Sequence, residues 1–172
     1  MIHPRIGMNI LSVSAAALLL GAMALAQSQQ DKTFVKTAME VNIGEMRIGQ
    51  LAAKKGGSEG VRKFGERTVA DHTRLENEIK PVAEKIGVAL PTELATDDQA
   101  LLTKLEGESG AEFDDTYIHA MVEGHREAVQ AYKTEEADGQ DAAVKNAATH
   151  GEQVVAEHLK LAEQLQSTMA KN

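Results

Sequence analysis

Four long stretches of this chain carry apolar residues at the 3.6-residue spacing of an α-helix, and only one of them contains a proline, Pro81. This spacing gives each helix one apolar face, which has to be buried against another helix. Aromatic residues make up 3% of the 172 residues and tryptophan is absent. The β-branched and aromatic runs that strands need are therefore scarce, and we predict an all-α fold.

The turn and capping residues set the expected helix boundaries. Asp31 is suited to an N-cap at the start of the first helix, and Pro81 should kink or divide the second. A short extra helix is expected at about 99–106, in the connection between the second and third helices. Residues 27–172 are expected to form a single domain, a four-helix bundle. Its long helices are expected at about residues 31–55, 58–86, 111–137 and 140–169.

The first 26 residues have the pattern of a signal peptide. Arg5 precedes an apolar run from Ile10 to Leu25, and the run ends in the small-x-small pattern Ala24-Leu25-Ala26. The run is shorter than the roughly 20 residues of a typical membrane span, so cleavage is favoured over a retained anchor. No later stretch is apolar enough to span a bilayer. We expect a periplasmic or secreted protein, either free or associated with the envelope.

Charge and cysteine content exclude several classes of function. The formal net charge of −8 argues against binding to nucleic acid or to anionic lipid surfaces. The chain has no cysteine, and hence neither disulfides nor thiolate ligands. No glycine-rich phosphate loop is present, so no organic cofactor is expected. A homodimer and an envelope partner are both compatible with the sequence, and no reaction can be assigned from it.

Four polar residues interrupt the apolar faces of the four long helices, one in each helix: Glu45, His72, His125 and His158. One inward polar side chain per helix is how a four-helix bundle builds an internal site. Glu45 and His72 should lie at similar depths from their turn, whereas His125 and His158 differ by about 7 Å at 1.5 Å per residue. Three imidazoles and one carboxylate form a ligand set for a single Zn, Fe or Cu ion.

Other residues near this predicted site are expected to support it. Asp71, Glu76 and Asp114 lie close enough in helical phase to accept hydrogen bonds from the imidazoles in a second layer around the metal. Several methionines also face inward and would suit Cu(I), although methionine at helical spacing is more often core filler.

Two alternatives to a metal site stay open at this point. In the first, the bundle is a metal-free structural or interaction domain of the envelope, and the histidines only satisfy a polar core. In the second, it senses pH, because buried imidazoles beside carboxylates titrate near the periplasmic range. A buried Glu45 is harder to explain without a cation, a metal or a raised pKa.

The segment FVKTAMEVNIGEMRIGQLAAKKGGSEGVRKFGERTVADHTRLENEIKPVAEKIGVALPTEL resembles the first half of a large bacterial family of exported, ferritin-like four-helix domains of unknown function. Members of this family are often labelled outer membrane proteins. The segments FDDTYIHAMVEGHREAVQAY and VVAEHLKLAEQL resemble its second half. The resemblance implies that Glu45, Asp71, His72, His125 and His158 belong to the recurring pattern of the family. Unlike ferritins proper, the chain has no Glu-x-x-His motif, which favours one metal over a di-iron pair.

Overall fold

The computed structural model describes the backbone of residues 11–171 and the side chains of residues 29–171. Within this part of the chain the regular structure is entirely helical, apart from an isolated bridge between Gly56 and Gly110. The all-α prediction is confirmed. The helices are α1 (Leu11–Lys55), α2 (Glu59–Ile86), α3 (Thr96–Gly107), α4 (Gly110–Asp138) and α5 (Ala142–Met169).

The largest difference from the predicted boundaries is at the start of α1. The helix begins at Leu11, so Asp31 lies inside it and is not an N-cap. Residues 11–30 are rich in alanine, leucine and glutamine and contain no proline, so nothing in that stretch stops the helix. The predicted signal peptide, residues 1–26, falls outside the described side chains, and residues 1–10 fall outside the described backbone. None of the helices in the described range is long and apolar enough to cross a membrane.

The second helix is not divided at Pro81, where a kink or a division was predicted. It runs through Pro81 and ends six residues after it, at Gly87. Pro81 is exposed, so its ring faces solvent, and only the hydrogen bond of its missing N–H is lost. Gly87 adopts a left-handed conformation with φ of 72°, and the amide of Val88 bonds to the carbonyl of Ala83. This is a typical glycine helix end.

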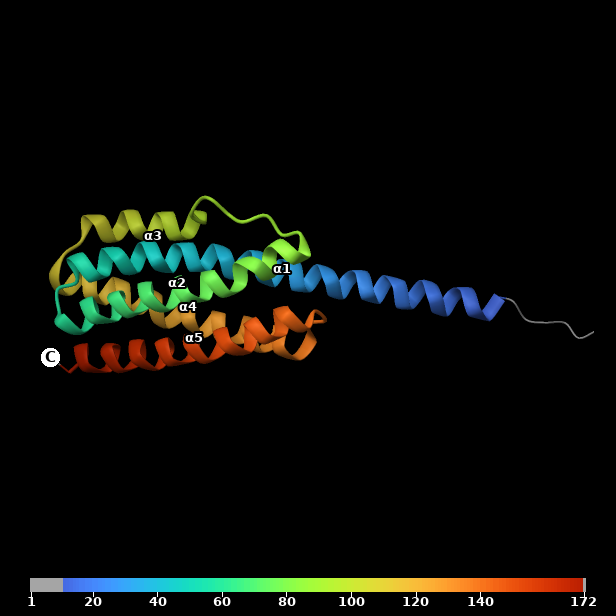
Figure 1. Cartoon of the computed structure of the whole chain (residues 1–172). Helices are drawn as coiled ribbons and strands as arrows, with labels where there is room; N and C mark the ends of the chain where they lie inside the picture. Colours follow the sequence, from blue (N-terminus) through green and yellow to red (C-terminus); the bar gives the residue numbers. More distant parts are fainter. Residues whose placement is uncertain (1–10, 172) are drawn as a thin grey trace, which may run out of the picture.

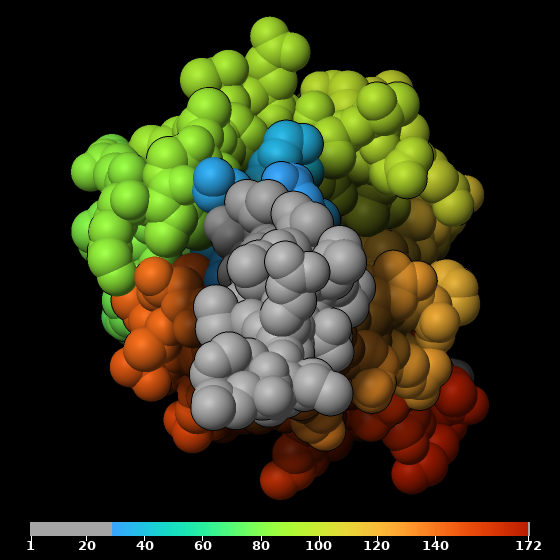
Figure 2. Space-filling view, turned by 90° about the vertical axis from the view of Figure 1, so that its right-hand side faces the viewer, coloured from blue at the N-terminus to red at the C-terminus, as the bar shows by residue number. Residues whose placement is uncertain are grey.

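Two helical hairpins pack side by side in an elongated molecule (Figure 1). The first consists of α1 and α2, the second of α4 and α5, and α2 also contacts α5 while α1 contacts α4. The long connection between the hairpins carries α3 along the outside, where it packs on α1 and touches α4. In the end-on view of Figure 2, the green segment after α2 and the yellow-orange α4 lie on opposite sides of α1.

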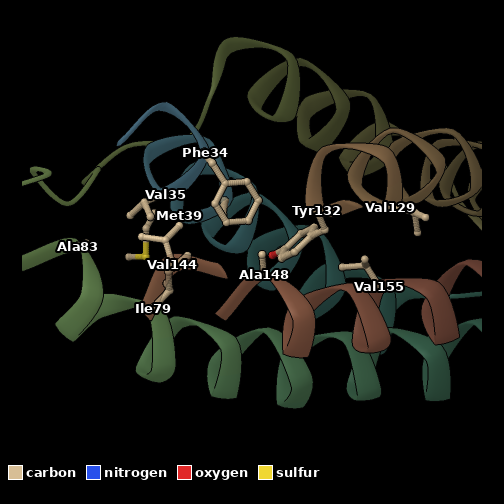
Figure 3. Packing of buried hydrophobic residues seen from close by; sticks show 11 residues of the cluster. Phe34, Val35, Met39, Ile79, Ala83, Val129, Tyr132, Val144, Ala148 and Val155 are labelled. Atoms are coloured by element: carbon tan, nitrogen blue, oxygen red, sulfur yellow. The ribbon is translucent and has the colours of Figure 1, made fainter. Parts of the chain in front are cut away.

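The interior is divided into two apolar clusters. The first contains Phe34, Val35, Met39, Ile79, Tyr132 and Val155, with an edge-to-face contact between the rings of Phe34 and Tyr132 at 5.1 Å (Figure 3). The second lies toward α3 and is formed by residues such as Ile48, Phe64, Leu105, Phe113 and Tyr117.

A polar layer separates the two clusters. Each of the four long helices has at least one buried polar residue that falls in sequence between the members of one apolar cluster and those of the other, whereas Asp31, Asp114 and Glu135 are buried outside this layer. The layer consists of Asn42, Glu45, Thr68, Asp71, His72, His125 and His158.

Candidate metal centre

Three buried imidazoles meet in the polar layer, each from a different helix. His72 comes from α2, His125 from α4 and His158 from α5, and none is more than 2% exposed. The ring centroids are 6.2 Å apart for His72 and His125, 5.5 Å for His72 and His158, and 5.4 Å for His125 and His158. One potential ligand nitrogen of each residue lies within 4.8 Å of those of the other two.

Each imidazole is held at one nitrogen by an oxygen of the core. His72 Nδ1 lies 2.8 Å from Asn42 Oδ1, and His125 Nδ1 donates to the backbone carbonyl of Met121 at 2.8 Å. His158 Nε2 lies 2.8 Å from Asp71 Oδ2. The other nitrogens, His72 Nε2, His125 Nε2 and His158 Nδ1, are buried without a hydrogen-bond partner. Each imidazole therefore donates at one nitrogen and keeps a lone pair on the other.

This donor set fits a transition metal. Metal-binding histidines almost always donate their second ring N–H to a carboxylate, a carbonyl or a similar acceptor, which fixes the tautomer. Imidazole nitrogens bind Zn²⁺ at about 2.1 Å, so three nitrogens of a tetrahedral site lie about 3.4 Å apart. The observed spacing, within 4.8 Å, requires an inward movement on the order of 1 Å to reach that geometry.

The direction of helical side chains explains why His125 and His158 meet despite their different distances from the α4–α5 turn. Every Cα–Cβ bond in a helix tilts toward its N-terminus. His125 therefore reaches away from the turn and His158 reaches back toward it. The mismatch of about 7 Å expected from the helical rise alone is removed by this opposite tilt.

Burial keeps two of the imidazoles neutral. It lowers the pKa of His72 to about 3, with smaller contributions from the neighbouring His125 and His158. Burial also lowers the pKa of His158, although the hydrogen bond to Asp71 acts in the opposite direction. A neutral imidazole is the form that binds metal.

Asp71 is the acceptor that the sequence predicted beside the site. Burial alone would raise the pKa of Asp71, but hydrogen bonds from His158 and Arg67 hold it below its ordinary value. Arg67 Nε donates to Asp71 Oδ2 at 3.2 Å, and Arg74 pairs with Oδ1. The carboxylate is therefore charged and anchored on both oxygens, and it orients the ring of His158.

Glu45 lies beside the histidines but outside the group of converging nitrogens. Its Oε1 is 3.8 Å from His125 Nδ1, the nitrogen that bonds to Met121, and its Oε2 is buried without a partner. Burial raises the pKa of Glu45, His125 opposes this shift, and the nearby carboxylate of Asp98 adds to it. The carboxyl group of Glu45 therefore lies on the Nδ1 side of the His125 ring.

The other two predicted acceptors lie elsewhere. Asp114 is at the end of the bundle, where its two carboxylate oxygens accept from the amides of Gly57 and Ser58 at 2.7 and 2.8 Å. It fastens the α1–α2 turn to α4. Glu76 is half-buried and makes no hydrogen bond to the three histidines in the described part of the chain. Both residues lie on the side of their helix that faces the histidines in the helical repeat. Asp114, however, lies at a different height along the bundle, next to the α1–α2 turn.

Asn42 is the functional residue that the sequence reasoning missed. It is 1% exposed, and its side chain holds His72 from the helix that contributes no histidine. Asn42 could have been found from the sequence, because it lies three residues before Glu45 and therefore on the same face of α1.

The other two histidines whose side chains the structure describes lie apart from the centre. His119 is exposed, and His150 is half-exposed in an ion pair with Glu78.

Comparison with known proteins places the chain in a family. A family model described as Domain of unknown function (DUF4142) matches residues 18–165. The chain belongs to the DUF4142 family. No curated protein and no solved structure gives a significant match.

Proposed function

We propose that this DUF4142 protein is exported to the periplasm and binds one transition metal ion through His72, His125 and His158. The observation that carries the proposal is the pairing pattern of the three rings. Each has one nitrogen bonded to an oxygen and a second nitrogen that is buried and unpaired, and one nitrogen of each ring lies within 4.8 Å of one nitrogen of each of the other two. Three unpaired buried acceptors in a core are costly unless a ligand occupies them.

Charge balance supports a divalent ion. The three imidazoles are neutral ligands, so the charge of the ion has to be offset by its surroundings. Asp71 accepts from His158, and the carboxyl group of Glu45 lies beside His125. Asp71 is already paired with Arg67 and Arg74, so a bound divalent ion would favour the ionised form of Glu45, and nitrogen ligands suit Zn²⁺, Fe²⁺ or Cu²⁺. Glu45 can also supply the fourth ligand directly. Its side chain would then have to change rotamer, because its carboxyl group now lies beside the Nδ1 atom of His125, which bonds to Met121.

The ligand set favours a ferritin-like bundle with a single metal over a di-iron protein. A di-iron carboxylate site uses bridging glutamates and two Glu-x-x-His motifs, and this sequence has none. We therefore place the protein in metal handling or in the response to envelope stress. Catalysis is not part of the proposal.

Metal analysis of the untagged protein tests the proposal. Protein purified from cells without a histidine tag is analysed by inductively coupled plasma mass spectrometry, together with the variants His72→Ala and His158→Ala. We expect about one equivalent of metal in the wild type and a loss of at least tenfold in both variants. His150→Ala, a substitution of the same type at a half-exposed site on α5, is the matched control and should retain the metal.

A metal-free structural domain predicts a different outcome. In that case the wild type and all three variants contain equally little metal, and the wild type takes up none when zinc, iron or copper is added. This result would overturn the proposal and leave the imidazoles as hydrogen-bonded parts of a polar core.

A further inference from the structure

A second cluster of titratable groups lies at the opposite end of the first apolar cluster, away from the histidines. Asp31 of α1 is 4% exposed and Glu135 of α4 is 1% exposed. Glu135 Oε2 accepts from Gln30 Nε2 at 3.3 Å, while Glu135 Oε1 is buried without a hydrogen-bond partner. Two acidic side chains that face each other in a covered position cannot both be charged without strong repulsion.

Asp31 also joins separate helices. Its Oδ1 accepts from the amide of Gln140 at 2.9 Å and its Oδ2 accepts from the amide of Asp141 at 3.1 Å. Asp141 in turn caps α5 through the amides of Ala143 and Val144, and its other carboxylate oxygen accepts from Lys85 of α2 at 3.2 Å. The α4–α5 turn is thus fastened to α1 by one carboxylate and to α2 by another.

The turn has no room for Glu135 to move aside. A side chain at Gly139 would collide with the carboxyl group of Glu135, so the turn is built closely around it. Among the described residues, the charged groups that face Glu135 are Asp31 from α1 and Lys145 from α5, and Gln30 is its neutral neighbour. The ammonium group of Lys145 is bonded to the carbonyl of Ala137.

We propose that Asp31 and Glu135 form a carboxyl–carboxylate latch: a shared proton fastens α1 to the α4–α5 turn, and loss of that proton loosens the turn. The latch is a conformational device that is independent of the histidines. In an exported protein, the attachment of the α4–α5 turn to α1 at Asp31 would then depend on external pH.

The direction of the pH effect follows from the titration of Glu135. Burial, and then the hydrogen bond and charge of Asp31, raise the pKa of Glu135 from 4.5 to about 7. A carboxyl group whose pKa is higher in the folded protein than in the unfolded chain stabilises the fold. This stabilisation is complete below the pKa of the unfolded chain and is lost as the pH rises to the pKa of the folded protein. The latch should therefore weaken between about pH 4.5 and 7 and change little above pH 7.

Amide hydrogen exchange of the full bundle tests the latch. Protection factors of Gln140 and Asp141, corrected for the intrinsic pH dependence of exchange, are measured from pH 5 to 8. In the wild type we expect protection to fall by up to about tenfold per pH unit below pH 7 and then to level off. In Glu135→Gln the amide donates to Asp31 without a charge, so protection should stay high and independent of pH.

A matched control uses the same chemical change elsewhere on α4. Glu127→Gln, at an exposed position, should keep the wild-type pH profile. Constant protection in the wild type across this range would overturn the latch, as would a pH-dependent profile retained in Glu135→Gln. Metal content is unaffected by either variant if the two sites are independent, so a failure of the latch is distinguishable from a failure of the metal site.

Discussion

At the scale of single residues, Asp71 is the carboxylate that contacts an imidazole of the candidate centre directly. It accepts from His158 and is itself fixed by Arg67 and Arg74. Such an acceptor fixes which nitrogen of the imidazole faces the metal and increases its basicity. Its effect should therefore appear in the metal affinity of the folded protein.

The variant Asp71→Asn tests this role. We expect metal affinity to fall by about 10–100-fold, because the neutral amide is a weaker acceptor for His158. Competition with a chromophoric chelator measures the change. Asp115→Asn, at an exposed position on α4, is the control and should bind like the wild type. An affinity within twofold of the wild type in Asp71→Asn would show that Asp71 does not position the ligand.

Asp114 provides a contrasting prediction. Its carboxylate accepts two backbone amides at the α1–α2 turn, far along the bundle from the histidines. Asp114→Ala leaves both amides without their partner and should lower the free energy of unfolding by about 1–3 kcal/mol. Urea denaturation measures this loss, and metal content should stay at one equivalent. A loss of metal in the folded variant would place Asp114 at the centre after all.

At the scale of elements, α1 and α2 approach each other closely at Gly49 and Gly65. A Cβ atom on Gly65 would lie 2.7 Å from the carbonyl oxygen of Gly49 and from the amide nitrogen of Ala53. These neighbours are backbone atoms and cannot turn away, so the two helices would have to separate. The helix pair that carries Asn42, Glu45 and His72 depends on this contact.

Gly65→Ala should therefore destabilise the bundle although alanine favours helices. We expect a loss of about 1–3 kcal/mol from overpacking, measured by urea denaturation. Gly124→Ala is the matched control, because a Cβ at that position on α4 meets no atom within 4 Å. It should be neutral or stabilising by up to about 1 kcal/mol. Equal effects of the two substitutions would contradict close packing at the α1–α2 crossing.

The sequence predicted the elements better than the connections between them. Apolar periodicity and glycine turns located the four long helices and the inward faces of His72, His125 and His158. Periodicity alone does not give depth along the bundle, which is why Asp114 was assigned to the site. It also does not identify the partner of a buried imidazole, and Asn42 was missed because its role depends on tertiary contact with His72.

At the scale of the whole molecule, the polar layer divides the core into two apolar halves. Without a ligand, the layer leaves three imidazole nitrogens unpaired. These buried polar atoms should lower the free energy of unfolding relative to a bundle in which every buried polar atom has a partner. A metal that binds only the folded state adds stability according to its affinity, about 4 kcal/mol at a concentration 1,000 times its Kd.

Metal removal should therefore lower the melting temperature. For a domain of this size, about 4 kcal/mol corresponds to roughly 8–16 °C. Differential scanning calorimetry before and after chelation, and again after metal is restored, measures the shift. The variant His125→Ala should melt at the same temperature with and without chelator. A wild type that does not respond to chelation and reloading would show that the polar layer is complete without metal.

The most direct test is nuclear magnetic resonance of the imidazole nitrogens in ¹⁵N-labelled, metal-free protein as one equivalent of Zn²⁺ is added. We predict that the signals of His72 Nε2, His125 Nε2 and His158 Nδ1 move together and saturate at one equivalent, while those of His119 and His150 stay in place. Unchanged signals from the three buried rings, or shifts confined to the two surface histidines, would contradict the metal centre.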